Sequence, residues 1–153
     1  MIDQWRLNTP FATNDAVVNT GWERPDDASF GRIGTGMSES SGIFTFPKTG
    51  VYLITTHFRL QIKNDLLAGY EMKVSTDSGS SSDVVATAYE NAKGDIASVM
   101  NASLSAAALV NVTNTSNFQF FIKSASIEDA STRIHGNTNE NQSMIIFERK
   151  GPA

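Results

Sequence analysis

Two histidines, His57 and His135, are the side chains of this chain best suited to act as a general base. His57 stands in a segment that alternates polar and apolar side chains, and His135 lies in the polar stretch RIHGN. Nucleophilic catalysis needs such a base next to a nucleophile and an orienting group, and zinc needs clustered ligands. Histidines on two separate segments favour ordinary surface or interface positions instead. We therefore predict that the protein is not an enzyme and has no catalytic residue.

Carboxylate oxygens for a calcium ion could come from Asp26 and Asp27 or from residues 77–83, DSGSSSD. Neither segment has the regular ligand spacing of a calcium-binding loop, so we expect solvated turns at both places. The glycines of FGRIGTG (30–36) lack the lysine and the helix start that a phosphate-binding loop requires. The absence of cysteine excludes disulfides, thiolate zinc sites and thiol chemistry. The sequence predicts no metal site and no cofactor.

The overall composition narrows the choice of partners. The 153-residue chain carries a formal net charge of −4 and no cluster of Lys and Arg. Nucleic acids and anionic membranes both select basic patches, so we expect neither as a partner. Only 18% of the residues are charged and 40% are hydrophobic, a balance that favours contact with another protein. No N-terminal signal segment is recognisable, and we expect one domain over residues 1–153.

The elements that must position these side chains are short β-strands separated by turns. Residues 51–63 are the clearest case, because every second side chain from Tyr52 to Ile62 forms one mostly apolar face. Residues 101–112 are rich in alanine, which favours a helix, but their alternation and β-branched end favour a strand. The predicted strands cover residues 2–7, 16–22, 43–46, 51–63, 70–76, 84–89, 96–100, 101–112, 118–124 and 143–149, with a hairpin turn at 92–95 and long loops at 77–83 and 126–142.

Two predicted strands are more hydrophobic than a sheet with one solvent face requires. Both faces of MIIF (144–147) are apolar, and in FQFFI (118–122) Phe121 points opposite to its apolar neighbours. One interpretation is a central strand whose outer face is covered by loops. The other is an interface with a second subunit, which would shield the extra apolar face.

The stretch GIFTFPKTGVYLITTHF (42–58) resembles the signature of the C1q/tumour-necrosis-factor superfamily of jelly-roll domains. In that signature an apolar strand ends near proline and Gly-x-Tyr opens the next strand, as Phe44, Gly50 and Tyr52 do here. The resemblance implies an all-β, antiparallel two-sheet jelly-roll sandwich of about ten strands. Gly50 would make the turn, while Phe44 and Tyr52 would anchor the core. The resemblance also implies a homotrimer with the last strand near the three-fold axis.

The implied trimer gives roles to residues outside the signature. Phe121, Ile145 and Phe147 become the predicted trimer-interface residues, because they lie on the two strands with excess apolar side chains. Trp5 and Trp22 are near the N-terminus, where the family pairs its first strand with its last. We expect them either in the core or in contact with a neighbouring subunit or a capsid lattice.

Residues 21–47, GWERPDDASFGRIGTGMSESSGIFTFP, look more like C1q-like proteins of bacteriophages, including phages of cyanobacteria, than like secreted animal ones. The expected function is a virion structural protein, a trimer that decorates or cements the shell by binding the phage major capsid protein. The alternative is the receptor-binding knob of a tail fibre, which would contact a host-surface glycan or protein through its long loops. We expect a chain that begins and ends with this domain to favour the cement role, and an upstream shaft to favour the knob.

Overall fold

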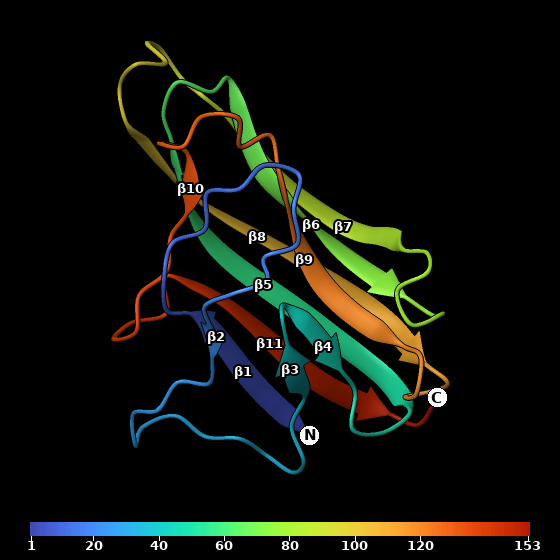
Figure 1. Ribbon diagram of the computed structural model, residues 1–153. Coiled ribbons are helices and arrows are strands. Elements are labelled where there is room, and N and C mark those ends of the chain that lie inside the picture. The colour runs from blue at the N-terminus through green and yellow to red at the C-terminus, as the bar shows by residue number, and fades with distance from the viewer.

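The computed structural model describes all residues 1–153 and contains eleven strands and no helix (Figure 1). The strands form two antiparallel sheets, one of six strands and one of five. The centre of the first sheet is β5 (Gly50–Ile62), which pairs along one edge with β8 (Met100–Val112). Along its other edge, β5 pairs with β11 (Ser143–Gly151) and the short β10 (Arg133–Ile134). The sheet continues from β11 to β1 (Ile2–Leu7) and then to β2 (Trp22–Glu23).

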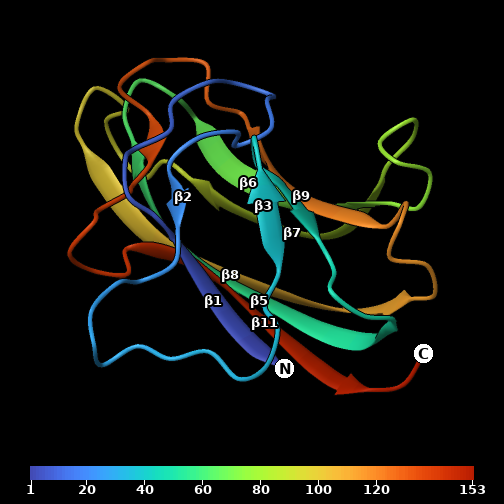
Figure 2. The ribbon, with the colours of Figure 1, turned by 60° about the horizontal axis from the view of Figure 1, so that its bottom comes forward.

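The second sheet lies against the first as a separate layer, which Figure 2 shows from the side. Its order is β3-β4-β9-β6-β7, and all its pairings are antiparallel. The strands are β3 (Ser38–Ser40), β4 (Ile43–Thr45), β6 (Leu67–Ser75), β7 (Asp83–Asn91) and β9 (Gln119–Ala125). The prediction of an all-β, antiparallel two-sheet sandwich is confirmed.

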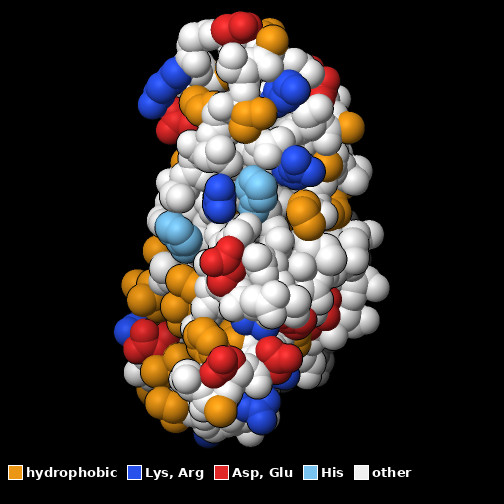
Figure 3. All heavy atoms as spheres, turned by 90° about the vertical axis from the view of Figure 1, so that its left-hand side faces the viewer, with side chains coloured by type: hydrophobic (Ala, Val, Ile, Leu, Met, Phe, Trp, Pro, Cys, Tyr) orange, Lys and Arg blue, Asp and Glu red, His pale blue; other side chains and the backbone are white.

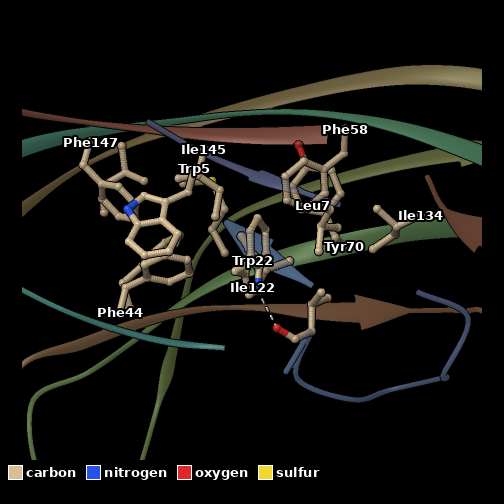
Figure 4. Packing of buried hydrophobic residues seen from close by; sticks show 14 of the residues in the cluster. Trp5, Leu7, Trp22, Phe44, Phe58, Tyr70, Ile122, Ile134, Ile145 and Phe147 are labelled. Carbon is tan, nitrogen blue, oxygen red and sulfur yellow. Dashed lines mark hydrogen bonds between the residues drawn. The ribbon is translucent and has the colours of Figure 1, made fainter. Parts of the chain in front are cut away.

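Aromatic side chains from both sheets fill the space between the layers (Figure 4). Trp5 and Trp22 each meet the ring of Phe44 edge-on with centroids 5.4 Å apart, and Phe147 lies 5.2 Å from the same ring. The Nε1 atom of Trp22 donates to the carbonyl of Val18 at 2.7 Å, so its polar atom is satisfied inside the protein. The tryptophans are only 7% and 9% exposed. They belong to the core, and the alternative of a subunit or capsid contact for them is wrong because almost no ring surface remains free.

The three signature residues lie at the start of β5 and beside it. Phe44 and Tyr52 are fully buried, and the Tyr52 hydroxyl donates to the carbonyl of Lys48 at 2.6 Å, which closes the turn before β5. Gly50 has a φ of +153°, and a Cβ there would lie 2.5 Å from the carbonyl oxygen of Gly151. Glycine is therefore required at this position by the close approach of β11.

Two of the predicted strands differ from the structure. Of residues 16–22, only Trp22 is in a strand, because the backbone turns at Gly21 (φ +82°) after a single bridge between Val17 and Lys123. Residues 96–99 form no strand, and 92–95 is not a hairpin turn. Strands β7 and β8 belong to different sheets, so this connection crosses from one layer to the other.

An ion pair between the buried Asp3 and the half-buried Arg24 fastens the long segment 24–37 to β1. The Asp3 carboxylate is fully buried and accepts hydrogen bonds from Arg24 Nε and Nη2 (both 2.9 Å), from Trp5 Nε1 (3.0 Å) and from the backbone N–H of Met37 (2.8 Å). The Arg24 guanidinium also lies over the Trp5 ring, 4.3 Å from its centroid. The network therefore ties both ends of the segment to the first strand.

The two ends of the chain lie in neighbouring strands. Strand β1 pairs with β11 from Ile2 opposite Glu148 to Arg6 opposite Met144. The backbone N–H of Arg149 donates to the carbonyl of Met1 at 2.9 Å. Both ends of the chain are consequently found in the lower part of the molecule in Figure 1.

Candidate subunit interface

The outer face of the first sheet carries its side chains in rows that run across β1, β11, β5 and β8. One row contains Ile2, Glu148, Leu53 and Leu109, and the next contains Gln4, Ile146, Thr55 and Ala107. Leu109 is 67% exposed and Ile2 is 36% exposed. We call the apolar members of these rows the apolar patch: Ile2, Leu53, Ala107, Leu109 and Ile146. Figure 3 shows hydrophobic side chains gathered in the lower part of this side of the molecule.

Strand β11 has apolar side chains on both faces, but the faces are the reverse of the prediction. Ile145 and Phe147 point between the sheets and have no exposed surface, whereas Met144 and Ile146 point outward and are half-buried. The assignment of Ile145 and Phe147 to the trimer interface is therefore wrong, because the core of the same subunit already covers them. Ile146 takes the outward place instead.

The third predicted interface residue, Phe121, lies on the outer face of the second sheet. It alternates on β9 with Phe120 and Ile122, which are fully buried in the core. Phe121 is only 9% exposed within the single chain. It leaves little surface for a second subunit to cover, and it does not adjoin the apolar patch of the other sheet.

Strand β8 forms an open edge of the first sheet, since it pairs only with β5. None of its thirteen residues is charged, and small side chains dominate its outward face. Open edges usually carry charges, bulges or proline, which prevent other strands from adding. A long, uncharged edge next to the exposed Leu109 favours coverage by another protein chain.

The other half of the same sheet face is basic. His57 and Arg59 point outward from β5, and Arg133 and His135 lie on or next to β10, which pairs with the end of β5. The backbone N–H of His135 donates to the carbonyl of Arg59 at 2.8 Å. Burial, and then the charges of Arg59 and Arg133, hold the pKa of His135 below its usual value. We call these four residues the basic cluster.

The His57 ring illustrates why this face does not resemble a catalytic centre. Its Nδ1 atom lies 3.0 Å from the Ser105 hydroxyl on the exposed surface. A serine nucleophile needs a histidine that is itself oriented by a third group, usually a carboxylate. The Ser105 hydroxyl is the only hydrogen-bond partner of the His57 ring. The arrangement is a cross-strand polar pair of the kind that stabilises sheets.

Comparison with known proteins identifies the fold but no sequence family. No family model matches the chain, and no curated protein sequence matches it. Among solved structures, Eiger TNF from S. frugiperda superposes with a TM-score of 0.73 at 12% identity over 100% of this chain and 94% of that chain. Murine APRIL at pH 8.5 gives 0.69 at 12% identity over 97% and 98%, and murine APRIL at pH 5.0 gives 0.67 at 14% identity over 98% and 100%. The fold is a TNF-like jelly roll.

The loops of this TNF-like sandwich are ordered by their own hydrogen bonds. In the 77–83 loop, Asp77 accepts bonds from the Ser81 hydroxyl and N–H and from the Ser75 hydroxyl, which lower the pKa of Asp77 to about 2. In the 126–142 segment, Asp65 accepts the backbone N–H groups of Glu128 and Asp129. No group of three His, Asp or Glu side chains is arranged to hold a metal ion. The structure contains no helix that is long and apolar enough to cross a membrane.

Proposed function

We propose that this protein is a non-catalytic structural subunit that assembles as a homotrimer through the outer face of its first sheet. The observation that carries the proposal is the apolar patch, in which Leu109 and Ile146 stand on a sheet face that a solvated sandwich would make polar. Its position supports the interface that the family resemblance implies, although Ile146 replaces Ile145 and Phe147 in it.

The positions of the patch and of the open edge support a closed ring over a two-fold dimer. The patch lies on the outer face of the sheet over β1, β11, β5 and β8, whereas the unpaired backbone groups of β8 lie along the edge of the sheet. The face and the edge are different surfaces. Contact between two different surfaces is heterologous, and such contacts form rings when the rotation closes. The resemblance of residues 42–58 implies that the ring contains three copies.

We propose further that the trimer is a bacteriophage virion protein that decorates the capsid shell and binds the major capsid protein. The support is the resemblance of residues 21–47 to C1q-like phage proteins, together with the low charge of the chain. The trimer would bind several capsid subunits only in the assembled shell and would stabilise that state by mass action. Electron cryo-microscopy of the particle tests this, because a decorating trimer gives density at the junctions between capsomers.

The alternative, a receptor-binding knob of a tail fibre, is favoured by one specific feature. A hollow of 480 Å³ opens between loops at one end of the sandwich. It is lined partly by Leu66, which is 73% exposed, and by Ile96 and Glu128. Apolar side chains on exposed loops are suited to binding a ligand. Density confined to the tips of tail appendages would favour this function over the capsid role.

The self-association is tested by substitution on the outer face. We expect the wild-type protein to have three times the 16.6 kDa mass of the chain in multi-angle light scattering. Ile146→Asp and Leu109→Asp would give monomers or insoluble protein, because each places a charge where the trimer is dry. Ser80→Asp, in an exposed loop, is the matched control and would remain trimeric. A monomeric wild type, or intact trimers of both interface variants, would overturn the proposal.

A further inference from the structure

The basic cluster contains two arginines that have no carboxylate partner. Six ion pairs occur in the chain, and neither Arg59 nor Arg133 belongs to any of them. The only side-chain hydrogen bond of Arg133 joins Nη2 to Gln61 Oε1 at 3.2 Å. Figure 3 shows Lys/Arg side chains next to a His side chain above the gathered hydrophobic side chains, with an Asp or Glu side chain directly below them. This concentration of positive charge occurs in a chain whose formal net charge is −4.

The carboxylates on this side of the molecule are engaged elsewhere. Glu23 binds Arg6 at 2.8 Å, and Glu148 binds Lys150 at 2.7 Å. Glu140 accepts hydrogen bonds from two neighbouring side-chain amides. Each of these three carboxylates would have to break an existing contact to neutralise the cluster.

Two polar atoms of the cluster also lack partners. The Nε atom of Arg133 and the Nε2 atom of His135 are buried and make no hydrogen bond. Buried polar atoms without partners are rare and costly in native proteins, so two of them on residues only two positions apart need an explanation. The lowered pKa of His135, which Arg59 and Arg133 help to cause, fits a site with excess positive charge.

We propose that the basic cluster binds a free inorganic oxyanion of the sulfate or phosphate type between the subunits. Arg59 and Arg133 would make the main contacts, because planar guanidinium groups match the paired oxygens of such anions. The inference rests partly on the proposed trimer, in which this face becomes buried. Burial of unpaired guanidinium charges is strongly unfavourable, and a dianion shared between subunits offsets it. The same burial would exclude larger anionic molecules.

Isothermal titration calorimetry with sodium sulfate, against sodium chloride at equal ionic strength, tests the site. We expect saturable sulfate binding by the wild type and by Arg32→Gln, an exposed arginine outside the cluster. Arg59→Gln and Arg133→Gln should each bind sulfate at least about tenfold more weakly than the wild type, since each loses charge-assisted hydrogen bonds. Arg59→Lys keeps the charge without the planar fork and should also bind more weakly, which guards against misfolding of the neutral variants.

The anion site would be overturned if the wild type showed no saturable heat of sulfate binding. It would also be overturned if both glutamine variants bound sulfate with the affinity of the wild type. Light scattering on the same samples separates this inference from the proposed function. A trimer that binds no sulfate contradicts the anion site and leaves the structural role intact. A monomer that binds sulfate in a manner dependent on Arg59 contradicts the trimer and the placement of the anion between subunits, but retains anion binding at the basic cluster.

Discussion

Asp3 is the most completely enclosed charge of the molecule, and four donors from three residues converge on its two oxygens. The pairing with Arg24 keeps that guanidinium over the Trp5 ring, so one carboxylate fixes an ion pair, a cation–π contact and a backbone N–H together. Removal of Asp3 leaves Trp5 Nε1 and the backbone N–H of Met37 buried without an acceptor.

We expect Asp3→Ala to lower the free energy of unfolding by about 1–3 kcal/mol, the range for leaving buried hydrogen-bond donors without an acceptor, because the half-buried Arg24 can still reach water. The physical reason is that Arg24, Trp5 Nε1 and the N–H of Met37 would lose their common acceptor. Urea denaturation followed by tryptophan fluorescence measures the loss. Asp27→Ala, at an exposed position, is the control. A change in Asp3→Ala no larger than in this control would contradict the assigned role.

His135 gives the stability a pH dependence of known sign. Its pKa in the folded protein lies below the usual 6.5, because burial and the charges of Arg59 and Arg133 disfavour the imidazolium. As the pH falls below 6.5, His135 is protonated in the unfolded chain before it is protonated in the folded chain, so its contribution to the free energy of unfolding decreases. This contribution is complete above pH 6.5 and is lost as the pH falls through the pKa of His135 in the folded protein.

An NMR titration of the His135 ring measures this directly. We expect a midpoint below that of the same histidine in the urea-unfolded chain. Saturating sulfate would raise the midpoint if the anion binds at the cluster, because a nearby negative charge favours the imidazolium. A midpoint at or above the unfolded value, without added anion, would show that the burial and the two arginine charges do not act on this ring.

At the scale of elements, β11 has one face in the core, with Ile145, and one outward face, with Ile146. Ile145→Ala should lower the free energy of unfolding by about 2–5 kcal/mol, since it leaves a cavity in the core. Ile33→Ala, at a position that is 63% exposed, should change it by less than about 0.5 kcal/mol. Chemical denaturation of both variants tests the assignment, and equal effects would contradict it.

The strands that alternation predicted well are those whose burial is decided by a single sheet face. In β5 every second residue is buried, and the pattern is visible in the residue types. In β11 both faces are apolar, so the pattern could not tell Ile145 from Ile146, and only the partner strands decide which one meets the core. The ion pair of Asp3 was not predicted, because its partners are more than 20 residues away in the sequence.

For the whole molecule, the succession of predicted strands and the segment 42–58 were sufficient to predict the TNF-like sandwich. In that segment Gly50 makes a turn, and Phe44 and Tyr52 pack in the core. The two halves of the outer face could not be predicted in the same way. The apolar patch and the basic cluster combine residues from β1, β5, β8, β10 and β11, which come together only through the pairing order of the first sheet. The surface on which the proposed function rests could therefore be recognised only after the strands of the first sheet had been placed side by side.

The pairing of β1 with β11 makes the order of the strands nearly independent of where the chain starts. Because Arg149 lies beside Met1, the residues after it together with a short linker can join the two ends without disturbing a strand. New ends can then be opened in the 77–83 loop, whose residues are exposed. The sandwich is thus a natural scaffold for circular permutation, and a guest sequence placed at that loop would be displayed on every subunit of the proposed trimer.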